Sequence, residues 1–157
     1  MLSQEESNKL VFGFNQTALT YEAKTVSVLF EEQVIKSPDS TAIVFGDKEL
    51  SYRELNEKAN QLAHYIRSKG MTSNSIVGLM VNRSLEMVIG ILGILKAGAA
   101  YLPIDPSYPS ERVAYMLNHS HTRLILTDRD NPDIKPTINC ECINISLSET
   151  TVYAADC

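Results

Sequence analysis

The sequence predicts an α/β fold built on a partial, doubly wound and mostly parallel sheet with helices on both faces. Short β-prone runs alternate along the chain with segments of helical spacing, and parallel neighbours need such crossover connections. Residues 76–81 are almost continuously apolar, which is typical of a strand covered on both faces. The chain has 157 residues, 44% of them hydrophobic, so we expect one core and not two full domains.

The charge of the chain favours neither a nucleic-acid partner nor a membrane partner. It has 14 basic and 19 acidic residues, a net charge of -5, and no block of five like charges. Residues 1–20 mix polar and charged side chains, so they lack the basic start and continuous apolar stretch of a secretory signal. We therefore expect a cytoplasmic protein.

The first 24 residues predict a linker that packs locally, because their apolar residues show no sustained period. From Val26 the apolar residues recur at three- and four-residue spacing, which predicts a helix. Ser37-Pro38 ends this helix, because proline disfavours helical geometry in the residue before it. Its acidic pair, Glu31-Glu32, is expected to face solvent.

A hairpin and a strongly marked helix follow. Residues 41–45 and 48–50 flank a turn at Gly46-Asp47, which predicts a small β-hairpin. Ser51 and Glu54 then have the spacing of a capping box, in which each side chain satisfies a free backbone amide. One apolar stripe runs along the predicted helix to Gly70, and it consists of Tyr52, Leu55, Ala59, Leu62, Ala63 and Ile66.

The next helix is predicted to be buried. Ser84 is placed to cap residues 85–97, which are apolar around most of the helix circumference. The segment is shorter than the ~20 apolar residues that span a bilayer. Gly90 and Gly93 are expected to let a neighbouring backbone approach closely, and Gly98 ends the helix.

The remaining elements continue the alternation. Residues 99–104 predict a strand, and a helix begins near Ser110 after a proline-rich break. Residues 123–127 and 138–145 predict two further strands.

The cysteines and histidines do not predict a metal site. Cys140, Cys142 and Cys157 are an odd number crowded near the end of the sequence, so we expect free thiols. Zinc sites usually have two to four residues between paired cysteines, whereas only one residue lies between Cys140 and Cys142. His119 and His121 fall at a predicted helix end, where imidazole faces solvent or favours the helix dipole.

A phosphate-binding or nucleophilic site is not predicted either. The Gly90-x-x-Gly93 pair lies inside a helix, and no glycine-rich phosphate motif precedes any helix. Gly98 is the last glycine and Lys135 the last lysine. No serine lies in a Gly-x-Ser-x-Gly pattern. We therefore assign no catalytic, cofactor-binding or metal-binding residue to this chain.

Two stretches resemble a known family. Residues 50–55, Leu-Ser-Tyr-Arg-Glu-Leu, resemble the first core motif of amino-acid-activating adenylation domains in nonribosomal peptide synthetases. Residues 95–105, Leu-Lys-Ala-Gly-Ala-Ala-Tyr-Leu-Pro-Ile-Asp, resemble the longer and more specific second motif. The likeness extends over about residues 25–128, and residues 15–18 are similar to the linker that follows an upstream condensation domain. The sequence departs from the family pattern at two places. Residues 21–24 replace the Tyr-Pro-containing segment that usually leads into the domain, and His119 stands where aspartate is more typical.

The resemblance implies an organisation and an activity. Residues 1–24 would be the condensation–adenylation linker, and residues 25–157 a truncated N-terminal portion of an adenylation domain of the adenylate-forming ANL superfamily. The parent would use ATP and Mg²⁺ to form an aminoacyl adenylate and load it onto the phosphopantetheine of a carrier domain. The family's phosphate loop, amino-acid pocket, ribose-binding aspartate and catalytic lysine all come later, so we expect this piece to be inactive alone.

The resemblance also implies partners and an alternative. The partners would be the remainder of the adenylation domain and the neighbouring condensation and carrier domains. The alternative to an enzyme fragment is a non-catalytic docking or complementation module. It would bind the remainder of a split synthetase, or a small MbtH-like protein whose docking surface would lie near residues 100–112. Membership of the acyl-CoA-type or luciferase-like branches of the superfamily is disfavoured, because the sequence of residues 95–105 resembles peptide synthetases more closely. A sheet cut midway leaves an unpaired edge, so we expect self-association.

Overall fold

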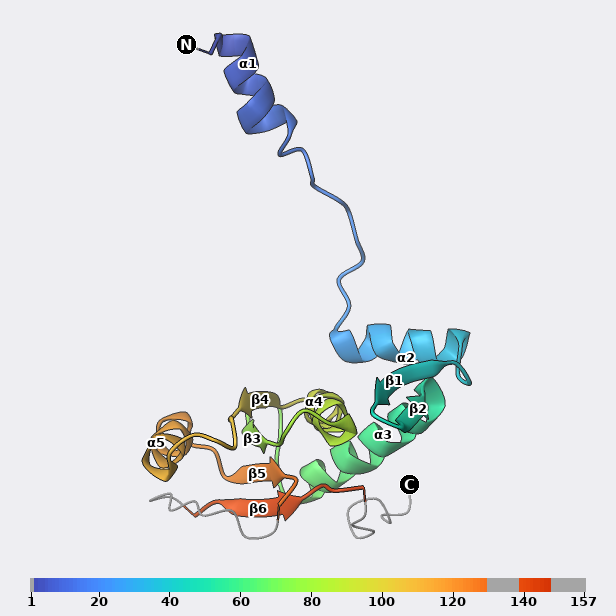
Figure 1. Cartoon of the computed structure of the whole chain (residues 1–157), viewed down its shortest axis with the longest axis vertical. Helices are drawn as coiled ribbons and strands as arrows, with labels where there is room; N and C mark the ends of the chain where they lie inside the picture. The colour runs from blue at the N-terminus through green and yellow to red at the C-terminus, as the bar shows by residue number, and fades with distance from the viewer. Residues whose placement is uncertain (1, 130–138, 148–157) are drawn as a thin grey trace.

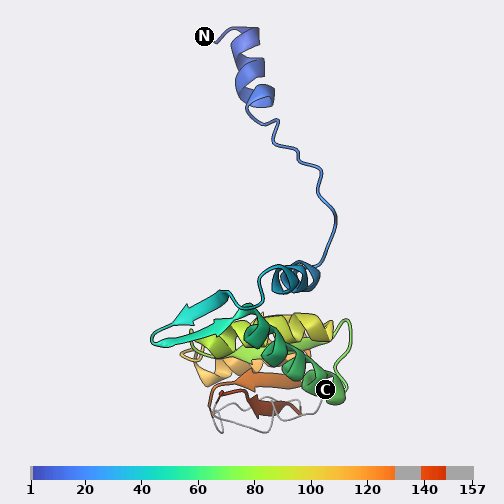
Figure 2. The same cartoon turned by 90° about the vertical axis from the view of Figure 1, so that its right-hand side faces the viewer.

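A four-stranded parallel sheet forms the centre of the structure, a computed structural model that describes residues 2–129 and 139–147. Every neighbouring pair in the sheet is parallel, as Figure 1 and Figure 2 show. The predicted α/β class with a mostly parallel sheet is confirmed. In sheet order, the strands are β4 (Ala100–Pro103), β3 (Ile76–Met80), β5 (Leu124–Thr127) and β6 (Glu141–Asn144).

The strands are slightly shorter than the sequence predicts. The apolar run 76–81 extends one residue beyond β3, and 99–104 extends one residue beyond each end of β4. Burial continues into these flanking residues, because Val81, Ala99 and Ile104 are all buried although they lie outside the strands. Residue 138 of the last predicted strand lies outside the described residues.

Helices cover both faces of the sheet, as predicted. The helices α3 (Tyr52–Ser68) and α4 (Leu85–Ala97) pack on one face, and α5 (Ser110–Ser120) packs on the other (Figure 1). Successive strand residues point to opposite faces. The face toward α3 and α4 presents Val77, Leu79, Leu124, Leu126 and Ile143, and the face toward α5 presents Met80 and Ile125.

The capping box of α3 is present in full. The Ser51 hydroxyl accepts a hydrogen bond from the Glu54 amide, and the Glu54 carboxylate accepts one from the Ser51 amide at 2.8 Å. Gly70 follows the helix with a φ of +79°, the left-handed conformation expected there. The predicted stripe is buried except for Tyr52, and its buried members are Leu55, Ala59, Leu62, Ala63 and Ile66.

The two glycines of α4 lie at its tightest contacts. A Cβ atom on Gly93 would lie 2.8 Å from Cγ of Leu62 in α3, and one on Gly90 would lie 2.6 Å from Cδ1 of Leu79 in β3. The predicted close approach is therefore present, but the approaching groups are leucine side chains rather than a backbone. Gly98 ends the helix with a φ of +86°.

The segments before α3 cover one end of this core. The helix α2 (Val26–Lys36) ends before Pro38, and β1 (Thr41–Phe45) pairs antiparallel with β2 (Lys48–Ser51), as predicted. The hairpin packs Ala42 and Ile43 against the main core. No residue of α2 is fully buried.

The N-terminal segment stands away from the rest of the protein. A short helix, α1 (Gln4–Asn8), continues into the π-helical turn η1 (Lys9–Gly13), and an extended stretch then leads to α2 (Figures 1 and 2). The sequence prediction placed no helix here and overlooked the capping box of Ser3 and Glu6. Within the described part of the chain, none of the helices has the length and apolar character needed to cross a membrane.

The Gly93 contact makes a stability prediction. We expect Gly93→Ala to lower the free energy of unfolding by about 1–2 kcal/mol, because the added methyl group meets the stem of Leu62 and overpacks the α3–α4 interface. Urea denaturation measures the change. Gly13→Ala is the matched control, because its Cβ would lie 3.7 Å from the Lys9 side chain, and it should stay within about 0.5 kcal/mol of wild type. Equal stabilities of the two variants would contradict the packing described here.

The capping box of α3 predicts a pH dependence. The backbone and side-chain hydrogen bonds from Ser51 lower the pKa of Glu54 below its ordinary value. The ionised carboxylate therefore stabilises the folded state above the unfolded-state pKa, and this contribution is lost as the pH falls through the lowered folded-state pKa. Urea unfolding between about pH 7 and pH 3 should show that Glu54→Gln flattens the acid loss of stability. Glu57→Gln, on the same helix but outside the box, controls for the loss of one charge. A Glu54→Gln profile parallel to wild type would refute the assignment.

Candidate functional site

The carboxyl edge of the parallel sheet brings together polar residues that follow three strands. Ligands of open α/β sheets bind beyond the carboxyl ends of the strands. Here β3 leads to Asn82, β4 leads to Asp105, and β5 leads directly to Asp128. This edge is therefore the first place to examine for a binding site.

A pair of hydrogen bonds ties the β3 and β5 ends together. The backbone amide and the Nδ2 amide of Asn82 each donate to Oδ2 of Asp128 at 2.9 Å. The other carboxylate oxygen, Oδ1, is buried and has no hydrogen-bond partner, although the Arg129 Nε atom lies 3.6 Å away. Asp128 thus has a fixed orientation and one remaining acceptor.

Asp105 shapes the turn after β4. Its Oδ1 atom accepts hydrogen bonds from the Ser107 hydroxyl at 2.7 Å and the Ser107 amide at 2.8 Å, and both bonds lower the pKa of Asp105. The carboxylate is therefore ionised and turned into its own loop. A groove of about 430 Å³ lies beside this turn, and its lining includes Asn82, Arg83, Met87, Tyr101, Pro103 and Tyr108.

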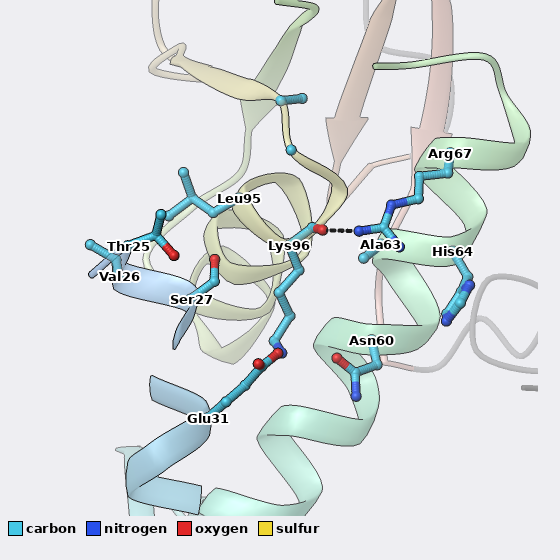
Figure 3. A pocket seen from close by; sticks show the side chains of 12 residues that line it. Thr25, Val26, Ser27, Glu31, Asn60, Ala63, His64, Arg67, Leu95 and Lys96 are labelled. Atoms are coloured by element: carbon cyan, nitrogen blue, oxygen red, sulfur yellow. Dashed lines mark hydrogen bonds and ion pairs between the residues drawn. The ribbon is translucent and has the colours of Figure 1, made fainter. Parts of the chain in front are cut away.

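A second and larger groove lies between α2, α3 and α4. It has a volume of about 600 Å³, and Figure 3 shows the side chains that line it. Lys96 of α4 and Glu31 of α2 point toward each other and form an ion pair. The Arg67 guanidinium of α3 donates to the carbonyl oxygens of Lys96 and Ala97 at the end of α4. Asn60 and His64 of α3 line the opposite wall.

The two cations of the larger groove that the structure pairs, Lys96 and Arg67, serve the fold. Lys96 and Arg67 are already engaged by a carboxylate and by helix-terminal carbonyls, and Arg83 is the cationic side chain that lines the smaller groove. Transfer of a phosphoryl group needs several positioned cations and amides around the triphosphate. Neither groove presents such a set. In the ranges 2–129 and 139–147, no three His, Cys, Asp or Glu side chains gather closely enough to hold a metal ion.

Among the described residues, the histidines and cysteines considered in the sequence belong to different elements, α5 with its C-cap and β6 with the residue before it. His119 stacks on Tyr115 at a ring-centroid distance of 5.7 Å in the last turn of α5, and His121 follows with a left-handed φ of +53°. Cys140 and Cys142 are free thiols. Burial raises the pKa of Cys140 to about 12, with a smaller contribution from Cys142, so this thiol stays protonated near neutral pH. Cys157 lies outside the described residues.

Sequence reasoning overlooked three side-chain pairs. Glu31 and Glu32 were expected simply to face solvent, but Glu31 pairs with the buried Lys96, and Glu32 accepts a hydrogen bond from Lys24 at 2.5 Å. The Asn82–Asp128 pair was also unforeseen. Its signal was available, because both residues directly follow predicted parallel strands whose carboxyl ends meet at one edge.

Comparison with known proteins identifies the family. A match to the family described as AMP-binding enzyme covers residues 30–156. The chain is 56% identical over 144 residues to tyrocidine synthase 2 of Brevibacillus parabrevis, which covers 91% of this chain and 4% of that protein. It is 54% identical over 156 residues to bacitracin synthase 3 of Bacillus licheniformis, which covers 99% of this chain and 2% of that protein. The chain thus spans only a small share of these relatives.

Solved structures agree with these sequence matches. The fold matches the nonribosomal peptide synthetase FmoA3 with a TM-score of 0.80 and 28% identity, over 88% of this chain and 15% of that chain. It matches the N-terminal subdomain of Klebsiella oxytoca NpsA with a TM-score of 0.74 and 25% identity, over 86% of this chain and 33% of that subdomain. The chain belongs to the AMP-binding enzyme family and forms the N-terminal part of a nonribosomal peptide synthetase adenylation domain.

Proposed function

We propose that this chain is the structural N-terminal part of an enzyme that activates an amino acid with MgATP. The carboxylate of the amino acid would attack the α-phosphate of ATP and release pyrophosphate. The aminoacyl adenylate would then pass to the phosphopantetheine thiol of a carrier domain. The observation that carries the proposal is the extensive identity with tyrocidine synthase 2, a peptide synthetase, across nearly the whole chain.

The chain alone is inactive in this proposal. A flexible cradle for a triphosphate needs a glycine-rich turn at a helix N-terminus, and no glycine follows Gly98. The cations Lys96 and Arg67 are engaged within the fold. ATP, Mg²⁺ and the amino acid would therefore bind only when the remainder of the adenylation domain supplies these groups. Condensation and carrier domains are the further partners of the complete synthetase.

The role of this part would be to present a rigid sheet edge. The Asn82–Asp128 hydrogen bonds and the Asp105 turn hold three strand ends in fixed positions. Such pre-arrangement lowers the cost of ordering a binding site later. The remainder of the domain would pack against this prepared edge.

A docking or complementation module is the second candidate function. Its support is the exposed outer edge of β4. There Tyr101 keeps 40% of its surface accessible and lines the groove of about 430 Å³ beside the turn after β4. Unpaired strand edges are places where another chain can add. The partner would be the remainder of a split synthetase or an MbtH-like protein, and an unoccupied edge would also favour self-association.

Exchange of labelled pyrophosphate into ATP tests the first proposal. The chain alone should give no amino-acid-dependent exchange above background, because the phosphate-binding groups are missing. Covalent extension through the rest of the adenylation domain should give exchange with at least one amino acid. Exchange by the chain alone, or none by the extended protein with any amino acid, would contradict the proposal.

Adding the remainder of the domain as a separate polypeptide tests the module. Exchange restored by mixing would support complementation, and Tyr101→Lys should weaken it by about tenfold, because a charge on the strand edge opposes pairing. Gly13→Ala, in the exposed N-terminal turn, is the control variant and should leave the restored rate unchanged. No restoration at any concentration, together with no binding of an MbtH-like protein, would reject the module.

A further inference from the structure

The helix α2 is anchored at only one end by backbone hydrogen bonds. The Tyr52 amide donates to the Ser40 carbonyl at 3.0 Å, and the Arg53 amide donates to the Pro38 carbonyl at 2.9 Å. These bonds fix the connection after α2 to the first turn of α3. The opposite end of α2 continues into the extended N-terminal segment, which stands away from the body (Figure 1).

An ion pair between a buried lysine and a half-exposed glutamate holds the middle of α2. The Lys96 side chain is only 5% exposed, whereas that of its partner Glu31 is 51% exposed. The Lys96 ammonium also lies 5.9 Å from the centroid of the Phe30 ring, next to Glu31 on α2. The backbone of Lys96 is held independently, because the Arg67 guanidinium donates to its carbonyl oxygen. Lys96 therefore joins α2 to a firmly held position in α4.

Phe30 adds an apolar contact, because its ring packs against the main core and its centroid lies 6.0 Å from that of the Tyr52 ring, but the remaining residues of α2 are partly or largely exposed. None of its residues is fully buried, and Ile35 and Val26 are 81% and 62% exposed. The ammonium of Lys24 pairs with Glu22 and Glu32, all within the same stretch of chain, so these pairs would move together with the helix. They add nothing to the attachment of α2 to the body.

We propose that α2 is a hinged helix, with residues 37–40 as the hinge and the Glu31–Lys96 pair as the latch. A displacement of the chain before Thr25 acts on the free end of α2 and reaches α4 through this pair. Opening of the latch leaves the buried ammonium of Lys96 without its counter-charge and widens the groove of Figure 3. The hinge and the latch would make the position of α2 on the body depend on the position of the N-terminal segment.

Release of α2 has a measurable consequence. A helix of 11 residues is marginal in water when it is not packed against a protein. Opening should therefore be followed by fraying of α2, while the core helices keep their hydrogen bonds. Such independent opening of one segment is what amide hydrogen exchange detects.

Hydrogen exchange of the full chain tests the latch. Glu31→Gln and Lys96→Gln should each speed exchange of the α2 amides by about tenfold or more, while amides of α3, β3 and β5 change by less than about twofold. The double variant should exchange no faster than the faster single variant, because the two residues act as one unit. Glu32→Gln, the neighbouring carboxylate on the same helix, is the matched control and should leave α2 exchange within about threefold of wild type.

Two results would overturn the proposal. Unchanged α2 exchange in Glu31→Gln would show that the pair does not hold the helix. Equal acceleration in α2 and in α3 would show that the pair supports the whole core instead of a hinged element. Because Glu31 is half exposed, Glu31→Gln keeps the test valid even if Lys96→Gln fails to fold.

Discussion

The packing of α4 against both α3 and the sheet is the constraint on which the rest of this structure depends. Gly93 brings α4 against Leu62, and Gly90 brings it against Leu79, so the missing side chains set the spacing of both layers. Close contact of this kind leaves no room for an added methyl group without strain. The end of α4 then fixes Lys96, and through it α2, while Gly98 starts the turn that leads to β4.

Most of the architecture could be predicted from the sequence, because the capping and turn residues mark the same element bounds as the pattern of apolar residues that become buried. The Ser51–Glu54 box, the Gly70 and Gly98 termini and the apolar run of β3 each indicate one element, and the structure has each of them. The Glu31–Lys96 pair could not be predicted so directly, because its residues are 65 positions apart. The Asn82–Asp128 pair, 46 positions apart, is indicated only by the place of both residues at the ends of predicted parallel strands. Their geometry depends on the completed sheet and on the seating of α2.

The described interactions also bear on the proposal that this chain contributes a framework to a site that further residues complete. The sheet edge is prepared by hydrogen bonds within the chain, and the buried cation is neutralised by its own ion pair. These interactions stabilise a framework and leave no set of free donors around a triphosphate. In the proposed function, the short stretch shared with tyrocidine synthase 2 and bacitracin synthase 3 is a scaffold, and the chemistry belongs to residues that would pack against its carboxyl edge.

Calorimetric titration of the chain with MgATP measures most directly whether this framework can hold nucleotide without the rest of the domain. The account predicts heats of dilution only, up to millimolar concentrations of nucleotide, because paired cations and a sequence without glycine after position 98 offer no cradle. A saturable isotherm of one nucleotide for each chain would contradict the account.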